Sequence, residues 1–257
     1  MSGIVTLITD FGAGSPYVAQ MKGVLLGANS GLQLVDVSHG VPPQGVREGA
    51  LLLRSTGFAF PQGTVHLVVV DPGVGTSRRG LAIACGGMFF VGPDNGVLGG
   101  ILDRPDAAVV SLDNPSFFRT PVSPTFHGRD IFAPVAAELA FGVSLEQVGT
   151  PCESTQPGVL PAFESKSGRL LGEVLGADAF GNLTTNLPGR RVSQVNPLVL
   201  RGQELPWVTT YGEAPAQRVV ALVGSDGYVE VAVRNDSALN NLGATVVGEP
   251  VSALSKE

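Results

Sequence analysis

The sequence has 257 residues, of which 44% are hydrophobic, with a net charge of −6 and an isoelectric point near 5.1. This length accommodates one large or two smaller domains, and the hydrophobic content supports a buried core and argues against disorder. The 16 basic residues are scattered along an acidic chain. Because nucleic-acid binding needs a basic face, we expect no nucleic-acid partner.

The N-terminus has no basic leader followed by an apolar segment, and no apolar stretch approaches the roughly 20 residues that a membrane span needs. The two cysteines, Cys85 and Cys152, provide neither a disulfide framework nor the spacing of a metal site. We therefore expect a cytoplasmic protein without a membrane partner.

The first half of the chain alternates strand and helix patterns. A helix is expected to begin at Pro16 with Ser15 as its N-cap, and a second covers residues 45–58, with Leu51, Leu52 and Leu53 inward. Such alternation predicts an α/β domain, with a doubly wound and mostly parallel sheet. The expected strands cover residues 4–8, 32–37, 67–70, 80–85, 88–91 and 108–112, with a hairpin between the fourth and the fifth.

The second half of the chain changes in composition. Residues 149–162 are rich in Gly, Pro, Ser and Thr and are read as a linker between a domain at 1–148 and a domain at 163–257. Beyond the linker, short strand patterns follow one another without a long helix, which predicts a smaller all-β barrel. The expected strands cover residues 169–175, 182–186, 197–201, 218–223, 228–233 and 244–247.

The segment VHLVVVDPGVGTSR, Val65 to Arg78, carries the first candidate site. A buried strand ends at Asp71, and Arg78 follows seven residues later. Asp10 follows the first strand in the same way, and open α/β sheets bind ligands at the carboxyl ends of their strands. The alternative interpretation, with about equal weight, is an aspartate held by turn amides and paired with a surface arginine.

His127 follows Phe126 in the segment FHGRD, directly before a predicted helix. The positive end of a helix disfavours an imidazolium, so a neutral histidine that orients or deprotonates a water is one interpretation, and a solvent-exposed loop histidine is the other. No metal motif, no G-x-G-x-x-G and no phosphate-binding loop is present in the sequence. We expect no metal site and no cofactor.

The segment DAFGNLTTN, Asp178 to Asn186, is the candidate site of the second domain. It gathers carboxylate, amide and hydroxyl groups around one glycine turn. An Asx-rich β-turn explains the pattern structurally, and binding of a zwitterionic amino-acid head group by Asp178 and Asn182 explains it functionally.

Six motifs in this order resemble the S-adenosyl-L-methionine (SAM) hydrolase family, also called SAM hydroxide adenosyltransferases, which is related to the fluorinases and chlorinases. The resemblance covers nearly the whole chain. Each motif alone is weakly specific, whereas six in register are strongly specific. The motifs are TDFG from Thr9, YVAQMKG from Tyr17, VDPGVGTSRR from Val70, GPDNG from Gly92, FHGRDIFAP from Phe126 and FGNLTTN from Phe180.

The resemblance implies an enzyme that hydrolyses SAM to adenosine and L-methionine by attack of a positioned water on C5′. It also implies a homotrimer whose sites lie between subunits, with SAM as the only small-molecule partner. The family's catalytic Asp–Arg–His set matches Asp71, Arg78 and His127. Positions that match substrate-binding residues are Asp10, Tyr17, Asp178, Asn182, Ser225, Glu230 and Val233.

The sequence differs from the family's motifs at some positions and leaves some assignments open. Arg79 stands beside Arg78 as a second candidate for the active arginine, Ser15 replaces an aspartate of many relatives, and the group that takes the water proton is left open. Halogenating relatives have a tyrosine and a serine where this chain has His127 and Gly128, which disfavours halide use. The alternatives to hydrolysis are a chlorinase-like halogenase and a non-catalytic adenosine- or SAM-binding module.

Overall fold

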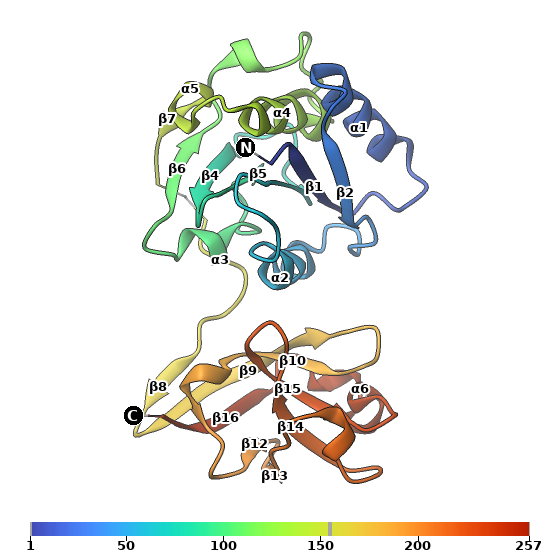
Figure 1. Cartoon of the computed structure of the whole chain (residues 1–257), viewed down its shortest axis with the longest axis vertical. Helices are drawn as coiled ribbons and strands as arrows, with labels where there is room; N and C mark the ends of the chain where they lie inside the picture. The colour runs from blue at the N-terminus through green and yellow to red at the C-terminus, as the bar shows by residue number, and fades with distance from the viewer. Residues whose placement is uncertain (1, 154–155, 257) are drawn as a thin grey trace. The chain divides into compact units, whose positions relative to one another are not determined.

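The computed structural model describes residues 2–153 and 156–256 (Figure 1). The chain divides into two compact units, Met1–Val159 and Leu160–Glu257. The boundary falls inside the segment 149–162 that the sequence marks as a linker. No helix among the described residues is long and apolar enough to cross a membrane.

The first unit is built around a seven-stranded sheet with the order β2-β1-β3-β5-β4-β6-β7. The four strands β2, β1, β3 and β5 are parallel, whereas β4, β6 and β7 run antiparallel to their neighbours. The sheet is therefore mixed, because the predicted β4–β5 hairpin reverses the chain direction inside it. Its strands are β1 (Ile4–Thr9), β2 (Gln33–Ser38), β3 (Val65–Val69), β4 (Gly80–Cys85), β5 (Met88–Pro93), β6 (Ala108–Ser111) and β7 (Thr150–Pro151).

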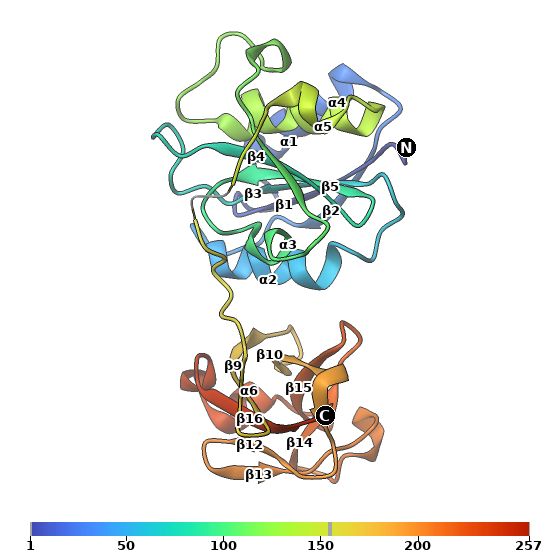
Figure 2. The same ribbon diagram turned by 90° about the vertical axis from the view of Figure 1, so that its left-hand side faces the viewer.

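Helices cover both faces of this sheet, as expected of a doubly wound unit. Helices α1 and α4 lie on one face, and α2 and α3 lie on the other (Figures 1 and 2). The helices are α1 (Pro16–Ala28), α2 (Val46–Thr56), α3 (Gly99–Leu102), α4 (Ala133–Phe141) and α5 (Leu145–Val148), with the 3-10 helix η1 (Pro115–Phe117) and the π-helix η2 (Gly128–Phe132).

The central strand β3 is buried along its whole length, which explains its continuous apolar sequence. Helix α1 begins as predicted, because the Ser15 side chain accepts a hydrogen bond from the Tyr17 amide at 3.2 Å and Pro16 occupies the first turn. Met21 and Leu25 of α1 pack in the same core as β3. The core therefore fixes the strand that leads to Asp71.

The second unit is an antiparallel sheet with the main order β13-β12-β16-β9-β10-β15-β14. A bridge between Trp207 and Ala221 links residues after β13 to β14, so the sheet is nearly closed and barrel-like. Its strands are β8 (Glu164–Lys166), β9 (Arg169–Ala177), β10 (Leu183–Pro188), β11 (Val192–Ser193), β12 (Leu198–Leu200), β13 (Gln203–Leu205), β14 (Val219–Val223), β15 (Tyr228–Val233) and β16 (Pro250–Ser255). Its helices are the short α6 (Ala238–Leu242) and the 3-10 turns η3 (Gly189–Arg191), η4 (Tyr211–Glu213) and η5 (Ala244–Val246).

Two local predictions are wrong. Residues 244–246 form η5 rather than a strand, because Gly243 and Gly248, both with positive φ, confine them to a tight turn before β16. Of the three leucines of α2, Leu53 alone is fully buried and Leu51 and Leu52 are partly exposed, because consecutive residues of a helix cannot share one face.

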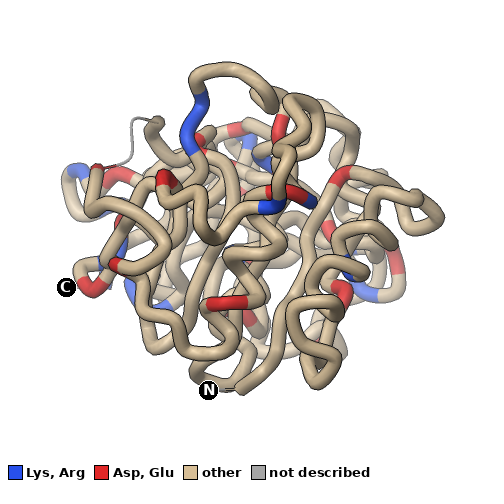
Figure 3. The backbone as a smooth tube through the Cα atoms, turned by 90° about the horizontal axis from the view of Figure 1, so that it is seen from above, with Lys and Arg blue, Asp and Glu red and all other residues tan. Residues whose placement is uncertain are grey.

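In the view of Figure 3 the described lysines and arginines lie among aspartates and glutamates rather than along one continuous stripe.

Candidate active site

The carboxyl ends of two neighbouring parallel strands define the site of the first unit. Strands β1 and β3 pair with Thr9 opposite Val69, so the chain leaves both strands at the same edge. Asp10 directly follows β1, and Asp71 lies two residues after β3. The structure therefore brings these two predicted carboxylates to one edge of the sheet.

Two glycines allow the loops at this edge to approach closely. Gly75 has φ +77°, and a Cβ at this position would overlap the carbonyl oxygen of Pro124. A Cβ at Gly128 would lie 2.9 Å from Cγ1 of Val69 in β3. The loop that carries Arg78 and the segment that carries His127 can meet because both positions lack a side chain.

Arg78 links the other two members of the predicted catalytic set. Its Nη2 donates to Oδ2 of Asp71 at 2.7 Å and lies 3.0 Å from Nδ1 of His127. Its Nη1 donates to the carbonyl oxygen of Arg79 at 2.8 Å, and its guanidinium stacks 5.3 Å from the centre of the Phe132 ring. With only 8% of its side chain exposed, Arg78 is held in one orientation.

This contact assigns the protonation of His127. A guanidinium only donates hydrogen bonds, so Nδ1 of His127 accepts from Arg78 and a neutral ring carries its proton on Nε2. Burial lowers the pKa of His127, and the positive charge of Arg78 lowers it further, against the opposing effects of Asp71 and Asp130. His127 is therefore neutral near pH 7, with Nε2–H as its free donor.

One carboxylate oxygen of Asp71 is hydrogen-bonded and the other is not. Oδ2 accepts from Arg78, whereas Oδ1 is buried and has no hydrogen-bond partner in the described part of the chain. Burial raises the pKa of Asp71, and the positive charge of Arg78 and the hydrogen bond from Arg78 oppose this effect. A buried acceptor without a donor costs free energy unless a donor such as water binds there.

Arg79 lies outside this network, although it is adjacent in sequence. Its Nη2 donates to Oδ2 of Asp94 at 2.9 Å and to the carbonyl oxygen of Glu153 at 2.7 Å. Of the two arginines, Arg78 is the one beside Asp71 and His127.

A pocket of about 390 Å³ opens at this edge of the sheet. Three of its aromatic residues form an edge-to-face trio, in which the Phe11 ring lies 5.7 Å from Tyr17 and 5.8 Å from Phe126, and the Tyr17 ring lies 5.3 Å from Phe126. The pocket is lined by Asp10, Phe11, Tyr17, Gln44, Val69, Asp71, Pro72, Val74, Thr125, Phe126, His127 and Gly128.

Asp10, Tyr17, Asp71 and His127 were predicted from sequence as site residues, and all four line this pocket. Phe11 and Phe126 stand inside the quoted motifs, but sequence reasoning gave them no role.

Gln44 was missed altogether. Its backbone amide donates to Oδ2 of Asp10 at 2.7 Å, and it has a positive φ of 64°. No pattern in the sequence marks this position.

The second unit has its own pocket, of about 530 Å³, on β15 and the segments beside it. Two of the predicted residues, Asn182 and Val233, line it. Asp178 adjoins it, since its carboxylate accepts hydrogen bonds from the backbone and side-chain amides of Asn182, each at 2.9 Å. The lining residues are Phe180, Asn182, Tyr211, Val233, Asn235, Asp236 and Ser237.

Glu230 does not line this pocket, but it is hydrogen-bonded to Tyr211, which does. The hydroxyl of Tyr211 donates to Oε2 of Glu230 at 2.6 Å. Burial raises the pKa of Glu230, as do the negative charges of Asp226 and Asp178, whereas the hydrogen bond from Tyr211 lowers it. Ser225 is exposed in the turn between β14 and β15 and does not line the pocket. The aromatic pair Phe180 and Tyr211 was missed, although Phe180 lies within the FGNLTTN motif.

No group of three or more His, Cys, Asp or Glu side chains within residues 2–153 and 156–256 could hold a metal ion. The ionisable groups at the first pocket are those of the Asp71–Arg78–His127 network and the Asp10 carboxylate.

These features define a two-unit protein in which an α/β unit carries a buried Asp–Arg–His hydrogen-bond network and an antiparallel β unit carries a second polar pocket. The chain belongs to the SAM hydroxide adenosyltransferase family. The model of the family's N-terminal domain matches residues 5–149, and that of its C-terminal domain matches residues 172–251.

Individual relatives agree with this assignment. An (R)-S-adenosyl-L-methionine hydrolase of Thermus thermophilus is 41% identical over 261 residues, covering 97% of this chain and 99% of the relative. One of Salinispora arenicola is 39% identical over 253 residues, covering 94% of each chain. The crystal structure of an uncharacterized conserved protein from Thermotoga maritima matches with a TM-score of 0.85 at 32% identity, covering 98% of this chain and 99% of that one. A fluorinase of Actinoplanes sp. is more distant, at 28% identity over 275 residues and 92% of each chain.

Proposed function

We propose that this protein hydrolyses SAM to adenosine and L-methionine by attack of a positioned water on C5′. The observation that carries the proposal is the unpartnered, buried Oδ1 of Asp71 inside a pocket that also holds His127. Relatives at about 40% identity over most of the chain are SAM hydrolases.

The residue types suit this reaction. The sulfonium of SAM leaves as a neutral thioether, so the departing group needs no proton and no Lewis acid. What the reaction needs is a water in line with the C–S bond and a group that takes its proton. Holding reactants in such a geometry can lower a barrier by roughly 7–11 kcal/mol.

The hydrogen-bond network supports Asp71 as the proton acceptor. Nδ1 of His127 is occupied by Arg78, and its Nε2 carries the ring proton, so neutral His127 acts as a donor rather than as a base. Oδ1 of Asp71 is the acceptor that remains, and its raised pKa strengthens it as a base. In this proposal the water donates to Oδ1 of Asp71 and accepts from Nε2–H of His127. Arg78 keeps both groups aligned and stabilises the developing hydroxide.

The remaining predicted residues are assigned to the substrate. Asp10 has a carboxylate oxygen beyond the one bonded to the Gln44 amide, and we propose that it accepts from the ribose hydroxyls. Tyr17 is 52% exposed at the rim of the same pocket and offers a ring for stacking. For the second unit we propose that Asp178, Asn182, Ser225, Glu230 and Val233 contact the methionine and adenosine parts of SAM.

We further propose a homotrimer whose sites are shared between subunits. Helix α1 supports association, because Gln20 and Lys22 are its only side chains with an amide or a charge. It nevertheless leaves Tyr17 and Leu26 exposed, at 52% and 42%. Large apolar side chains that a helix leaves exposed mark a surface that a partner can cover. We also propose a cytoplasmic location, which the free thiols of Cys85 and Cys152 support, since disulfides are rare in a reducing compartment.

The experiment is incubation of the purified chain with SAM, with and without chloride, followed by chromatography of the products. Hydrolysis predicts equal amounts of adenosine and methionine, in both conditions. The double variant Asp71→Ala/His127→Ala is expected to retain SAM binding and to lose most turnover. Wild-type turnover by this variant would refute the role assigned to the two residues.

The two alternative functions give other outcomes. A halogenase would form 5′-chloro-5′-deoxyadenosine, and a binding module would hold SAM without releasing methionine over hours. A serine at position 128, as in halogenating relatives, would place its Cβ 2.9 Å from Cγ1 of Val69, which argues against a halogenase-type site in this chain.

A further inference from the structure

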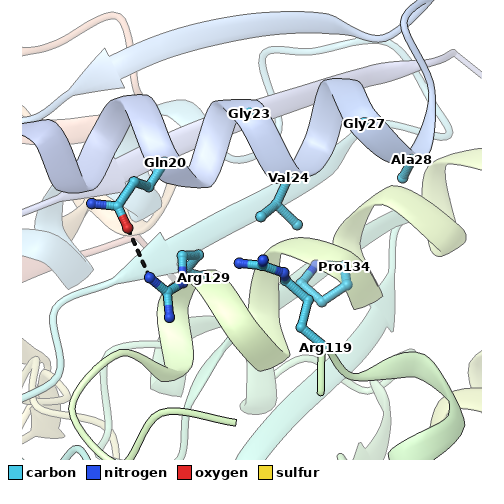
Figure 4. A pocket seen from close by; sticks show the side chains of 8 residues that line it. All are labelled: Gln20, Gly23, Val24, Gly27, Ala28, Arg119, Arg129 and Pro134. Atoms are coloured by element: carbon cyan, nitrogen blue, oxygen red, sulfur yellow. Dashed lines mark hydrogen bonds between the residues drawn. The ribbon is translucent and has the colours of Figure 1, made fainter. Parts of the chain in front are cut away.

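A groove on the first unit lies between α1 and the segment formed by η2 and α4 (Figure 4). Its volume is about 610 Å³. It is separate from the pocket that holds Asp71, with which it shares no lining residue. It is lined by Gln20, Gly23, Val24, Gly27, Ala28, Arg119, Arg129 and Pro134.

Two arginines of this groove share one carboxylate. Arg129 forms a two-point ion pair with Asp130, from Nε to Oδ1 at 2.7 Å and from Nη2 to Oδ2 at 2.8 Å. Nη1 of Arg119 donates to the same Oδ1 at 3.2 Å, and the amide of Ser123 donates to Oδ2 at 2.9 Å. Asp130 is buried and neutralises only one of the two guanidinium groups, so this cluster carries one net positive charge.

The two guanidinium groups differ in how many of their nitrogens already donate hydrogen bonds. Arg129 uses its third nitrogen, Nη1, to donate to Oε1 of Gln20 at 2.8 Å (Figure 4). Arg119 is 48% exposed, and the contact with Asp130 is its one side-chain hydrogen bond within the described residues. Arg119 therefore presents most of its planar donor fork to the groove, beside a second cation that is held in place.

The opposite wall leaves room for a ligand. A Cβ added to Gly23 or Gly27 of α1 would meet nothing within 4 Å, so the groove is open along the helix backbone. Val24 and Pro134 supply apolar wall, and none of the eight described lining residues is acidic. A planar, weakly hydrated guanidinium beside open apolar space is suited to the oxygens of a phosphate or a carboxylate.

We propose that this groove binds a small oxyanion, the phosphate or carboxylate group of a metabolite, through Arg119 and Arg129. The site goes beyond SAM hydrolysis, since neither arginine lines the pocket that holds Asp71. The ligand's body would lie along Gly23, Val24 and Gly27 of α1.

The position of the groove connects it to catalysis. The guanidinium of Arg129 lies 5.1 Å from the ring centre of Phe126, which lines the active-site pocket beside His127. The π-helix η2 begins at Gly128, directly after His127, and includes Arg129. An anion that restrains Arg129 also restrains the turn that carries His127, so occupancy is expected to change the rate of SAM turnover.

The test measures binding of inorganic phosphate, and separately of succinate, by calorimetry on the full chain at constant ionic strength. We expect saturable, millimolar or tighter binding of at least one of them, and the comparison distinguishes phosphate from carboxylate as the source. Arg119→Gln should weaken this binding by at least about tenfold, which corresponds to loss of a charge-assisted hydrogen bond. Arg119→Lys keeps the positive charge, so its affinity for the anion should lie between that of the wild type and that of Arg119→Gln.

Arg104→Gln is the matched control. Arg104 is 46% exposed and pairs with an aspartate, Asp106, at 3.5 Å, but it does not line the groove. This variant should bind as the wild type does. Absence of saturable binding, or equal losses in the Arg104 and Arg119 variants, would overturn the proposal. A change of oligomeric state in Arg119→Gln, seen by light scattering, would overturn it in favour of an interface between copies of the chain.

Turnover of SAM at saturating anion tests the link to catalysis. The turnover rate of the wild type should change when the anion is added, whereas that of Arg119→Gln should not. An unchanged wild-type rate would refute the link. The binding measurement does not depend on hydrolysis, so failure of this site and failure of the proposed function are distinguishable.

Discussion

Replacing Asp71 with asparagine removes the proposed proton acceptor while keeping the shape of the side chain. Nη2 of Arg78 donates to the Oδ2 position at 2.7 Å, so the amide oxygen of asparagine will occupy that position and its NH₂ will replace Oδ1. The attacking water then meets a donor where the wild type offers an acceptor. We expect turnover to fall by about 10²- to 10⁴-fold, the usual contribution of a general base.

The pH dependence gives a second measure of the same change. Asp71 acts only when ionised, and burial raises its pKa above the ordinary value. The wild-type rate should therefore fall as the pH drops through this raised pKa, and the residual rate of the asparagine variant should lack that acid limb. Binding of SAM should change little, because the network loses one charge and keeps its geometry.

The assay is release of methionine at saturating SAM over a range of pH. Asp94→Asn is the matched control, because Asp94 is also buried and also pairs with an arginine, Arg79, at 2.9 Å, but lies outside the pocket. Its turnover should stay within about threefold of wild type, since a change away from reacting groups leaves the barrier nearly unaltered. The reasoning is refuted if Asp71→Asn retains turnover within that range, or if both variants lose activity equally.

Three further substitutions have measurable outcomes. Burial lowers the pKa of His66 from 6.5 to about 4, so protonation of this histidine destabilises the fold. The difference in the free energy of unfolding between wild type and His66→Gln should therefore shrink by about 3 kcal/mol as the pH falls from 6.5 to 4. A difference that stays constant with pH in urea titrations would contradict this. Gly128→Ser places a Cβ 2.9 Å from Val69 and should cost about 1–3 kcal/mol of stability, measured by thermal unfolding, whereas an unchanged midpoint would show that the contact relaxes freely. Tyr211→Phe removes the 2.6 Å hydrogen bond to Glu230 and should raise KM about tenfold, with a smaller effect on kcat; an unchanged KM would separate this pair from substrate binding.

Patterns that depend on local chemistry were readable from the sequence. The run from Leu67 to Val70 predicts a buried strand that ends at Asp71, and β3 is buried throughout. Ser15 and Pro16 mark a helix start, and α1 begins there. Such signals need only neighbouring residues, because caps and buried strands are local features.

Features that depend on distant partners were not readable. The segment 244–247 has a strand-like composition, but two glycines with positive φ place a turn there, and the strand follows at Pro250–Ser255. The apolar stretch 97–102 contains the short helix α3, which no periodicity marks. In both cases the tertiary environment decides between short apolar alternatives.

The candidate site shows the same division. Motifs place Asp71, Arg78 and His127 in the sequence, but Arg78 and Arg79 differ by one position, and only their partners in space separate them. The backbone amide of Gln44 beside Asp10 has no signature at all, since any residue type supplies an amide. Which nitrogen of His127 carries the proton also follows from the contact with Arg78 and from nothing in the sequence.

The central claim, that water attacks C5′ of SAM, is tested most directly by hydrolysis of SAM in isotopically labelled water. Mass spectrometry of the products should find the oxygen label in the 5′-hydroxyl of adenosine, with unlabelled methionine in equal amount. Adenosine without label, or a product other than adenosine and methionine, would contradict attack of water on C5′.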